Sequence, residues 1–119
     1  SDVYKRQFLR DVSKKYSDCA TVVAIKNETE TMGYAAYYKN DIVNKKAFLS
    51  MIIVGRKFQG SGFGQKLLDY VIHDSRKSGM QILSLEVNKS NCTALKFYGK
   101  NGFVNEYEND SSFFMLLTL

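Results

Sequence analysis

The hydrophobic positions of this chain change period along its length, and the change predicts its secondary structure. Short runs of β-branched and apolar residues alternate with segments in which apolar residues recur every three or four positions. The first pattern is typical of strands and the second of amphipathic helices. The runs predict strands at residues 21–26, 32–39, 48–54, 82–87, 103–107 and 112–119, and the helical spacing predicts helices at 62–78 and 91–101.

The start of the chain carries a further helical pattern. Tyr4, Phe8, Val12 and Tyr16 recur at every fourth position, which predicts an amphipathic helix over residues 3–17. The complete order is then a helix, three strands, a helix, a strand, a helix and two strands. This order predicts an α/β fold, with a mixed sheet and helices on both faces.

A glycine-rich segment joins the apolar run 48–54 to the helix that follows. Gly60, Gly62 and Gly64 stand at alternate positions, so no Cβ atom there separates a ligand from the main chain. The segment also opens a helix, whose first N–H groups lack intrahelical partners and whose dipole favours negative charge. A strand, a bare loop and a helix N-terminus together predict an anion site, most naturally for phosphate.

Three well-known phosphate-binding loops do not fit this segment. A dinucleotide-binding loop requires a third glycine where Gln65 stands, and a Walker loop requires Ser or Thr where Leu67 stands. A protein-kinase loop needs one more residue between its glycines, and neither His-Arg-Asp nor Asp-Phe-Gly follows. The pattern that fits is Gln/Arg-x-x-Gly-x-Gly, which is formed by Gln59, Gly62 and Gly64.

This pattern resembles the acetyl-CoA pyrophosphate loop of the GCN5-related N-acetyltransferases, the GNAT superfamily. A second segment resembles the other signature of that family, a strand followed by Asn-x-x-Ala-x-x-x-Tyr-x-x-x-Gly-Phe, and it matches at Asn91, Ala94, Tyr98, Gly102 and Phe103. One helix and one strand join the two motifs, as in the family. The resemblance runs from about residue 21 to the C-terminus and implies the acyl-CoA N-acyltransferase fold, with a mixed, mostly antiparallel sheet.

The resemblance implies that the chain uses acetyl-CoA as a co-substrate and needs no metal. Main-chain groups of the loop would hold the pyrophosphate, and those of the preceding strand would pair with the pantetheine arm and steady the developing oxyanion. Asn91 would contact the same arm. The implied coenzyme-binding residues are Ile52, Ile53, Val54, Gln59, Gly60, Ser61, Gly62, Phe63, Gly64, Gln65, Asn91 and Tyr98.

The resemblance also implies two catalytic residues. Tyr98 would be the general acid for the leaving thiolate, because a phenol with a pKa of about 10 is protonated at neutral pH. The strand before the loop has no carboxylate, so Glu86, on the next strand and twelve residues before Tyr98, is the expected base. This arrangement resembles the ribosomal-protein N-terminal acetyltransferases, in which a carboxylate in a partly desolvated cleft would act directly or through water.

Composition limits the classes of function. The 119 residues, 45% of them hydrophobic, suit a single packed domain over residues 1–119. Cys19 and Cys92 lie far apart and form no C-x-x-C pair, so neither a disulfide framework nor a metal site is expected. No stretch has the length and apolarity of a membrane span, and none has the pattern of a signal peptide, so we expect a cytoplasmic protein.

The formal net charge of +5 is compatible with nucleic-acid binding, but the charges are scattered along the chain. A polyanionic coenzyme near Arg56, Lys57, Lys66 and Lys96 accounts for part of the excess. We therefore expect neither nucleic acid nor a membrane as a partner. The expected partner is an amine acceptor on a small molecule or a peptide, and a homodimer is left open.

The N-terminus predicts an incomplete reading frame. The chain has no initiator Met, and residues 1–7 resemble translated sequencing-adapter sequence. The family's fold usually opens with a strand and two helices, whereas this chain has room for about one helix. We therefore expect an N-terminal truncation, in which the first strand is missing and residues 1–7 are non-native.

The sequence thus predicts an N-acetyltransferase that transfers an acetyl group from acetyl-CoA to a primary amine by direct attack. The alternative is an acetyl-CoA-binding sensor or scaffold module of the same fold, without turnover. Replacing Tyr98 with Phe separates the two, because only an enzyme has turnover to lose.

Overall fold

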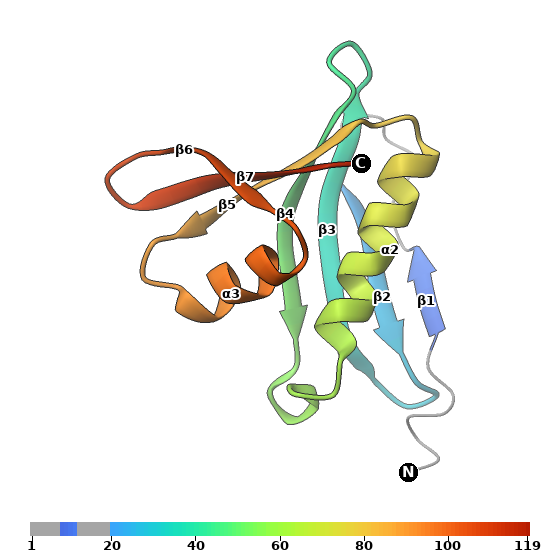
Figure 1. The fold of residues 1–119 in the computed structure, drawn as a ribbon. Coiled ribbons are helices and arrows are strands. Elements are labelled where there is room, and N and C mark those ends of the chain that lie inside the picture. The colour runs from blue at the N-terminus through green and yellow to red at the C-terminus, as the bar shows by residue number, and fades with distance from the viewer. Residues whose placement is uncertain (1–7, 12–19) are drawn as a thin grey trace.

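The computed structural model describes residues 8–11 and 20–119 of the chain. The strands of this part form one sheet in the order β1-β2-β3-β4-β5-β7-β6 (Figure 1). The elements are β1 (Phe8–Asp11), β2 (Thr21–Lys26), β3 (Thr31–Asp41), β4 (Lys46–Val54), the 3-10 helix η1 (Arg56–Phe58), α2 (Phe63–Lys77), β5 (Ile82–Asn88), α3 (Cys92–Lys100), β6 (Val104–Glu108) and β7 (Ser112–Thr118).

The sheet is antiparallel except at its centre, where β4 and β5 run parallel. A parallel pair requires a crossover connection, and α2 supplies it. The mixed, mostly antiparallel sheet expected from the sequence is confirmed. The fold belongs to the α/β class, as the alternation of strand and helix patterns in the sequence had indicated.

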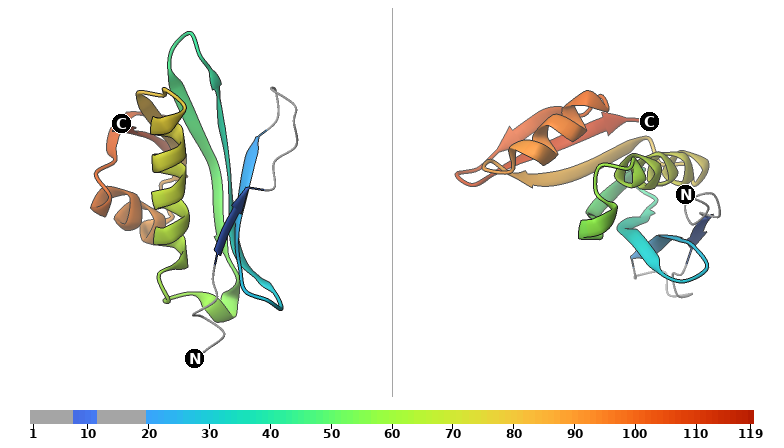
Figure 2. Two further views of the ribbon diagram at one scale, coloured as in Figure 1. Left: turned by 90° about the vertical axis from the view of Figure 1, so that its right-hand side faces the viewer. Right: turned by 90° about the horizontal axis from the view of Figure 1, so that it is seen from below.

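The two central strands stay together over only the first part of β4. Their register runs from Lys46 opposite Ile82 to Leu49 opposite Leu85, and no later residue of β4 pairs with β5 in the described chain. Seen from below in Figure 2, the β5–β7–β6 arm turns away from the half of the sheet formed by β2, β3 and β4. From residue 50 to residue 54, β4 therefore presents a main-chain edge toward a gap, which we call the open edge.

A β-bulge marks the point where β4 leaves β5. Ala36 and Tyr37 are neighbours on β3, but their partners Met51 and Leu49 are two positions apart, so Ser50 is the extra residue. A bulge reverses the alternation of a strand. Beyond it, the even-numbered positions of β4 face the same side as Leu49, and the odd-numbered positions face the other side.

The two described helices lie on one face of the sheet, which we call the helix face (Figures 1 and 2). Gln65 on α2 donates through Nε2 to Asn101 Oδ1 just after α3 at 2.7 Å, and Asn101 Nδ2 donates back to Gln65 Oε1 at 3.1 Å. The sequence analysis expected helices on both faces of the sheet, and α2 and α3 lie on the same one. The opposite side of the sheet is called the far face below.

The helix expected over residues 3–17 is wrong at Phe8–Asp11, which form β1; the rest of that range lies outside the described residues. β1 pairs antiparallel with β2, with Phe8 opposite Lys26 and Asp11 opposite Val23. A strand thus occupies the outer position beside β2, where the first strand was expected to be missing. A spacing of four residues is twice the strand period and close to one helical turn, so the pattern does not discriminate between the two structures.

The core lies between the sheet and α2. The apolar stripe of α2, including Leu67, Leu68 and Val71, is fully buried. A polar anchor supports it, because Asp74 Oδ2 accepts hydrogen bonds from the Tyr37 hydroxyl at 2.5 Å and from Lys39 Nζ at 2.7 Å. These contacts hold α2 along β3 and so place its N-terminus beside the end of β4.

Candidate functional site

The glycine loop, residues 59–64, leads from η1 into α2. Gly60 and Gly62 have φ angles of +81° and +83°, and Gly62 is the N-cap of α2. A Cβ atom at either position would meet nothing within 4 Å, so the backbone conformation rather than crowding requires glycine there. The Lys66 N–H donates to the Gly62 carbonyl at 3.1 Å, so the N–H groups before Lys66 point out of the helix end. No acidic residue occupies the first turn of α2, which leaves the N-terminal dipole available to an anion.

Two side chains close the loop onto the protein. Gln59 Nε2 donates to the Val54 carbonyl at 3.2 Å, which ties the loop to the end of β4. Phe58 is buried and meets the ring of Phe63 edge-on, with 6.1 Å between the ring centroids. The loop is therefore held in place by the protein's own contacts.

Asn91, expected to contact the coenzyme, caps α3. Its Oδ1 accepts a hydrogen bond from the Ala94 N–H at 3.1 Å, the usual task of an asparagine at a helix start. This capping role explains on local grounds why the second motif begins with an asparagine. In the part of the chain described, no hydrogen bond engages its Nδ2.

Tyr98 is half-buried on α3 between two other aromatic rings. Its ring centroid lies 5.2 Å from that of Phe97 and 5.4 Å from that of Phe103, both in edge-on arrangements. Burial raises the pKa of the Tyr98 phenol above its ordinary value of 10.0, because a phenolate would lose solvation there. The hydroxyl is therefore protonated at neutral pH.

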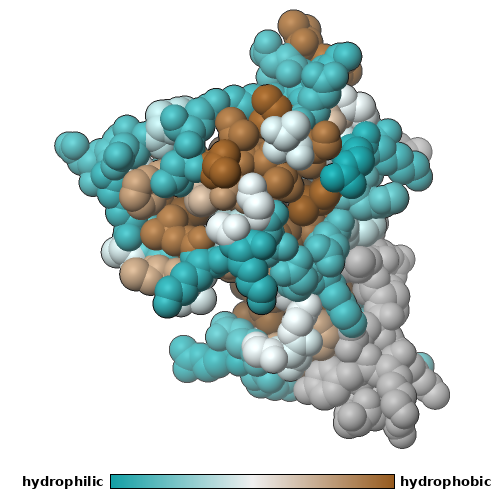
Figure 3. Space-filling view, viewed as in Figure 1, coloured by the Kyte–Doolittle hydropathy of each residue, from teal (hydrophilic) through white to brown (hydrophobic). Residues whose placement is uncertain are grey.

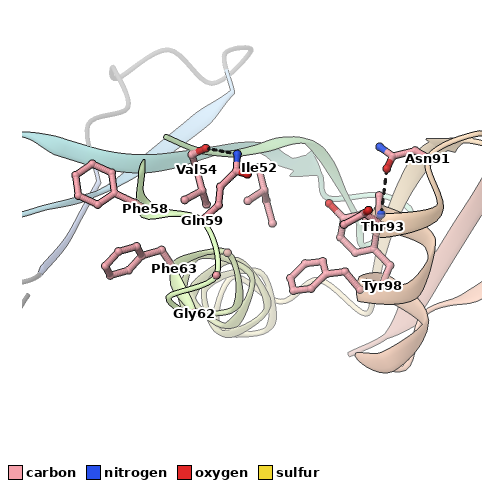
Figure 4. Close-up of a pocket in the computed structure, with 13 residues that line it drawn as sticks. Ile52, Val54, Phe58, Gln59, Gly62, Phe63, Asn91, Thr93 and Tyr98 are labelled. Carbon is pink, nitrogen blue, oxygen red and sulfur yellow. Dashed lines mark hydrogen bonds between the residues drawn. The ribbon is translucent and has the colours of Figure 1, made fainter. Parts of the chain in front are cut away.

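A pocket of about 480 Å³ lies between the glycine loop and α3. In the space-filling view a cleft separates the lower part of the molecule from the part above it (Figure 3). The close-up shows residues of β4, the loop and α2 on one side and residues of α3 on the other (Figure 4). The volume is typical of pockets that bind small ligands, which range over roughly 300–1,000 Å³. The lining residues are Ile52, Val54, Phe58, Gln59, Gly60, Gly62, Phe63, Gly64, Asn91, Thr93, Ala94, Phe97 and Tyr98.

The pocket brings the two sequence motifs together. Nine of the expected site residues line it: Ile52, Val54, Gln59, Gly60, Gly62, Phe63, Gly64, Asn91 and Tyr98. Sequence reasoning assigned no coenzyme role to Phe58, Thr93, Ala94 or Phe97. The signal for Phe97 was available, because it lies three residues after Ala94 of the second motif and four after Thr93, so these three residues share one side of α3.

Three expected coenzyme-binding residues do not line the pocket. Ile53 faces away from it, on the far face, because neighbouring residues of a strand point to opposite sides. Ser61 is exposed at the tip of the loop. The Gln65 side chain is engaged by Asp69 and Asn101, so it joins α2 to the end of α3.

Glu86, the expected base, also lies outside the pocket. It follows Leu85, the last residue of β5 that pairs with β4. Leu85 and Val87 are buried on the helix face, so Glu86 points to the far face, where it is exposed rather than partly desolvated. Glu86 therefore stands on the opposite side of the sheet from Tyr98, at the edge of the gap between the two strands.

Among residues 8–11 and 20–119, no group of three or more His, Cys, Asp or Glu side chains could hold a metal ion. None of the helices in the described part of the chain is long and apolar enough to cross a membrane. Among the cationic residues near the glycine loop, Lys57 forms an ion pair with Glu30, in which Lys57 Nζ lies 3.0 Å from Glu30 Oε2.

The parted central strands and the glycine loop define the class of protein, the acyl-CoA N-acyltransferase fold. The chain belongs to the acetyltransferase (GNAT) family, whose sequence model matches residues 2–103.

Curated relatives give the family match more detail. The chain is 35% identical over 75 residues to the [ribosomal protein bS18]-alanine N-acetyltransferase of Escherichia coli K12, an alignment that covers 63% of this chain and 51% of the relative. The enzyme of the same name from Salmonella typhimurium is 36% identical over 69 residues, which cover 58% of this chain and 47% of the relative. The chain thus spans about half the length of the curated relatives it matches.

Solved structures match the fold over more of the chain. A GNAT family acetyltransferase from Elizabethkingia anophelis with acetyl-CoA bound superposes with a TM-score of 0.82 at 18% identity, over 96% of this chain and 99% of that one. The ribosomal-protein-S18-alanine N-acetyltransferase from Escherichia coli gives 0.72 at 23% identity, over 98% and 83%. At such identities the likeness establishes the fold.

Proposed function

We propose that the protein is an N-acetyltransferase that binds acetyl-CoA in the pocket and transfers the acetyl group to a primary amine. The observation that carries the proposal is the pocket itself. It brings the glycine loop, the open edge of β4 and Tyr98 together, although the two motifs lie about 30 residues apart in the chain.

The residues present fit acetyl-CoA, which supplies the acetyl thioester. The outward N–H groups of the loop and of the first turn of α2 suit a pyrophosphate, and Gly60 and Gly62 leave the approach to them clear. The open edge of β4 offers main-chain N–H and C=O groups to the amides of a pantetheine arm. Ile52 and Val54 supply an apolar wall for the same arm.

Tyr98 is proposed as the proton donor to the departing thiolate. Its hydroxyl is protonated at neutral pH, and Tyr98 lines the same pocket as Ile52 of the open edge. Main-chain N–H groups of that edge are proposed to stabilise the negative charge that develops on the acetyl oxygen.

Glu86 is proposed as the base, working from the far face. The pocket lies on the helix face, and the proposed route of the amine is from the other side of the sheet, where β4 no longer pairs with β5. Glu86 stands where the gap between these strands begins, next to the last paired residue of β5. Its carboxylate would accept the proton of the incoming ammonium, directly or through water.

The names of the curated relatives support a peptide α-amine as one form of acceptor, because those enzymes act on the N-terminal alanine of a ribosomal protein. A small-molecule amine is the other form. Both present the same reacting group, so the proposal covers the primary amine that they share.

The experiment that tests the proposal is thermal unfolding with acetyl-CoA, with ATP and NADH as controls, followed by thiol release with primary amines. A ligand at 100 times its dissociation constant stabilises by about 2.7 kcal/mol, which raises the midpoint by roughly ten degrees in a domain of this size. We expect a shift with acetyl-CoA alone and amine-dependent thiol release. A shift without release would favour the sensor or scaffold, and equal shifts with ATP would contradict the coenzyme assignment.

A further inference from the structure

The far face of the sheet is apolar, yet Glu86 projects from it. In residues 8–11 and 20–119 the ion pairs engage Glu30, Asp74 and Glu108, and none engages Glu86. Exposed large apolar side chains share this face with it. Those with between 37 and 57% of their surface exposed are Tyr34, Tyr38, Phe48, Met51, Ile53 and Tyr107.

Two aromatic rings continue the row that begins at Glu86. Glu86 on β5 pairs with Phe114 on β7, and Phe114 pairs with Tyr107 on β6. Residues paired across antiparallel strands point to the same face, and neighbouring strands lie about 4.8 Å apart. The rings of Tyr107 and Phe114 are stacked, with centroids 4.4 Å apart and planes inclined by 12°. A stacked aromatic pair therefore lies in the same row as Glu86 and on the same face of the sheet.

A β-bulge on β6 puts Tyr107 in this row. Asn105 pairs with Met115 and Tyr107 with Phe114, although Met115 and Phe114 are neighbours, so Glu106 is the extra residue. Without the bulge Tyr107 would share the side of Asn105 and face the helices. Bulges of this kind re-aim a side chain, and this one stacks an aromatic ring on Phe114, on the face that carries Glu86.

The row has the chemistry of a site for an amphipathic cation. The carboxylate attracts an ammonium group, and the aromatic faces accept a ring or an apolar substituent next to it. A second ammonium or a set of hydroxyls would have to give up hydration where it lies against the aromatic rings. Met51 and Ile53 line the β4 side of the gap, so the surface on both sides is apolar.

Resting on the proposed function, we propose that the acceptor is a primary amine that carries an aromatic or large apolar group close to the nitrogen, with Glu86, Phe114 and Tyr107 as the residues that select it. Polyamines and heavily hydroxylated amines are poor acceptors. The selected chemistry is shared by an arylalkylamine and by a peptide whose first side chain is aromatic.

The first test compares matched acceptors. For free amines, kcat/KM is measured with 2-phenylethylamine, ethylamine and putrescine; for peptides, with two peptides that differ only in Phe or Gly as the first residue. We expect kcat/KM for 2-phenylethylamine to exceed that for ethylamine, or kcat/KM for the Phe peptide to exceed that for the Gly peptide, by about tenfold or more. Apolar contacts of this size discriminate between substrates by that factor. The arm with the higher kcat/KM identifies the source of the amine.

The second test changes the aromatic surface. Tyr107→Ala is expected to lower the preference for 2-phenylethylamine over ethylamine by about tenfold, mainly through KM. Tyr107→Lys is expected to abolish the preference, because a cation there would pair with Glu86. Tyr38→Ala is the matched control, because Tyr38 is an exposed tyrosine on β3 that lies on the same face but outside the row. We expect this variant to keep the wild-type preference for 2-phenylethylamine over ethylamine.

The outcomes separate the inference from the proposed function. Equal kcat/KM values for ethylamine and 2-phenylethylamine, or a preference for putrescine, would overturn the inference and leave an N-acetyltransferase. An unchanged preference for 2-phenylethylamine over ethylamine in both Tyr107 variants would also overturn the inference. The same holds if the protein is a dimer and Tyr107→Lys dissociates it without changing that preference. Failure to acetylate any amine would contradict the proposed function and the inference together.

Discussion

Tyr98 shows how a single side chain takes its chemical properties from its packing. The ring is held between Phe97 and Phe103, and burial raises the pKa of its phenol. A general acid must be protonated when the leaving group departs, so this environment suits the proposed role. A free-standing tyrosine would be equally protonated at pH 7, but it would not be held at the wall of the pocket.

At this scale we expect Tyr98→Phe to lower kcat by about 10²–10⁴-fold, the usual contribution of a positioned acid, while the dissociation constant of acetyl-CoA changes by less than about twofold. Because the pKa of Tyr98 is raised from 10.0, the wild type should show no loss of kcat from its ionisation below that pH. The measurements are steady-state kinetics over pH and calorimetric binding. Tyr70→Phe, on α2 and outside the pocket, is the control, and equal kcat values for the Tyr98 variant and the wild type would remove Tyr98 from the mechanism.

At the scale of elements, the loop and α2 act as one unit. α2 begins after a glycine with positive φ, and the N–H groups of its first turn point out of the helix end beside the pocket. The helix after it is connected through Gln65 and Asn101, so the two walls of the pocket are joined by hydrogen bonds on the helix face. Anion binding by this unit depends on the backbone, and a glycine substitution is therefore the direct test.

Gly62→Ala and Gly79→Ala form a matched pair, because both glycines have positive φ, +83° and +88°, and both have open space around the Cβ position. Each variant is expected to lose about 1–2 kcal/mol of unfolding free energy through the left-handed conformation alone. We expect only Gly62→Ala to raise the dissociation constant of acetyl-CoA, by roughly tenfold, since its methyl group would stand where the pyrophosphate approaches. Denaturant titration and calorimetry measure the two quantities, and equal affinities in the two variants would place the pyrophosphate elsewhere.

At the scale of the whole molecule, the docking of α2 on the sheet depends on one carboxylate. The Asp74 side chain is only 17% exposed, and this desolvation tends to raise its pKa. Hydrogen bonds from Lys39 and Tyr37, together with the positive charges of Lys39 and Lys77, outweigh the desolvation and lower the pKa from 3.8. A carboxyl group with a lowered pKa in the folded state stabilises the fold above its unfolded-state pKa. That stabilisation disappears as the pH falls through the folded-state value.

We therefore expect the free energy of unfolding to fall as the pH is lowered below about 4, and Asp74→Asn to remove part of that dependence. At neutral pH the same substitution is expected to cost roughly 2 kcal/mol, because it weakens hydrogen bonds to a charged group. Asp69→Asn, at an exposed position of the same helix, should change the stability by less than about 0.5 kcal/mol. Urea titrations from pH 3 to pH 7 measure all three proteins, and parallel pH curves for wild type and Asp74→Asn would contradict the assignment.

The sequence by itself determined what depends on local pattern. The periods of apolar residues placed the strands and helices from residue 21 onward close to their observed bounds, and the two motifs located the residues that meet in the pocket. The glycines at positions 60 and 62 predicted the bend, because few other residues adopt a backbone conformation with positive φ. These features are decided by neighbours within a few positions along the chain.

Only the tertiary structure decided which side of the sheet each residue faces and what lies beside it. The bulge at Ser50 directs Ile52 and Val54 into the pocket and turns Ile53 away, and the bulge at Glu106 brings Tyr107 beside Phe114, in the row that begins at Glu86. The strand at Phe8–Asp11 also emerged only from its pairing with β2, because its spacing suits a helix equally well. The physical reason is common to these cases: strand register and bulges are set by hydrogen bonds between distant segments, and a shift of one residue moves a side chain to the opposite face.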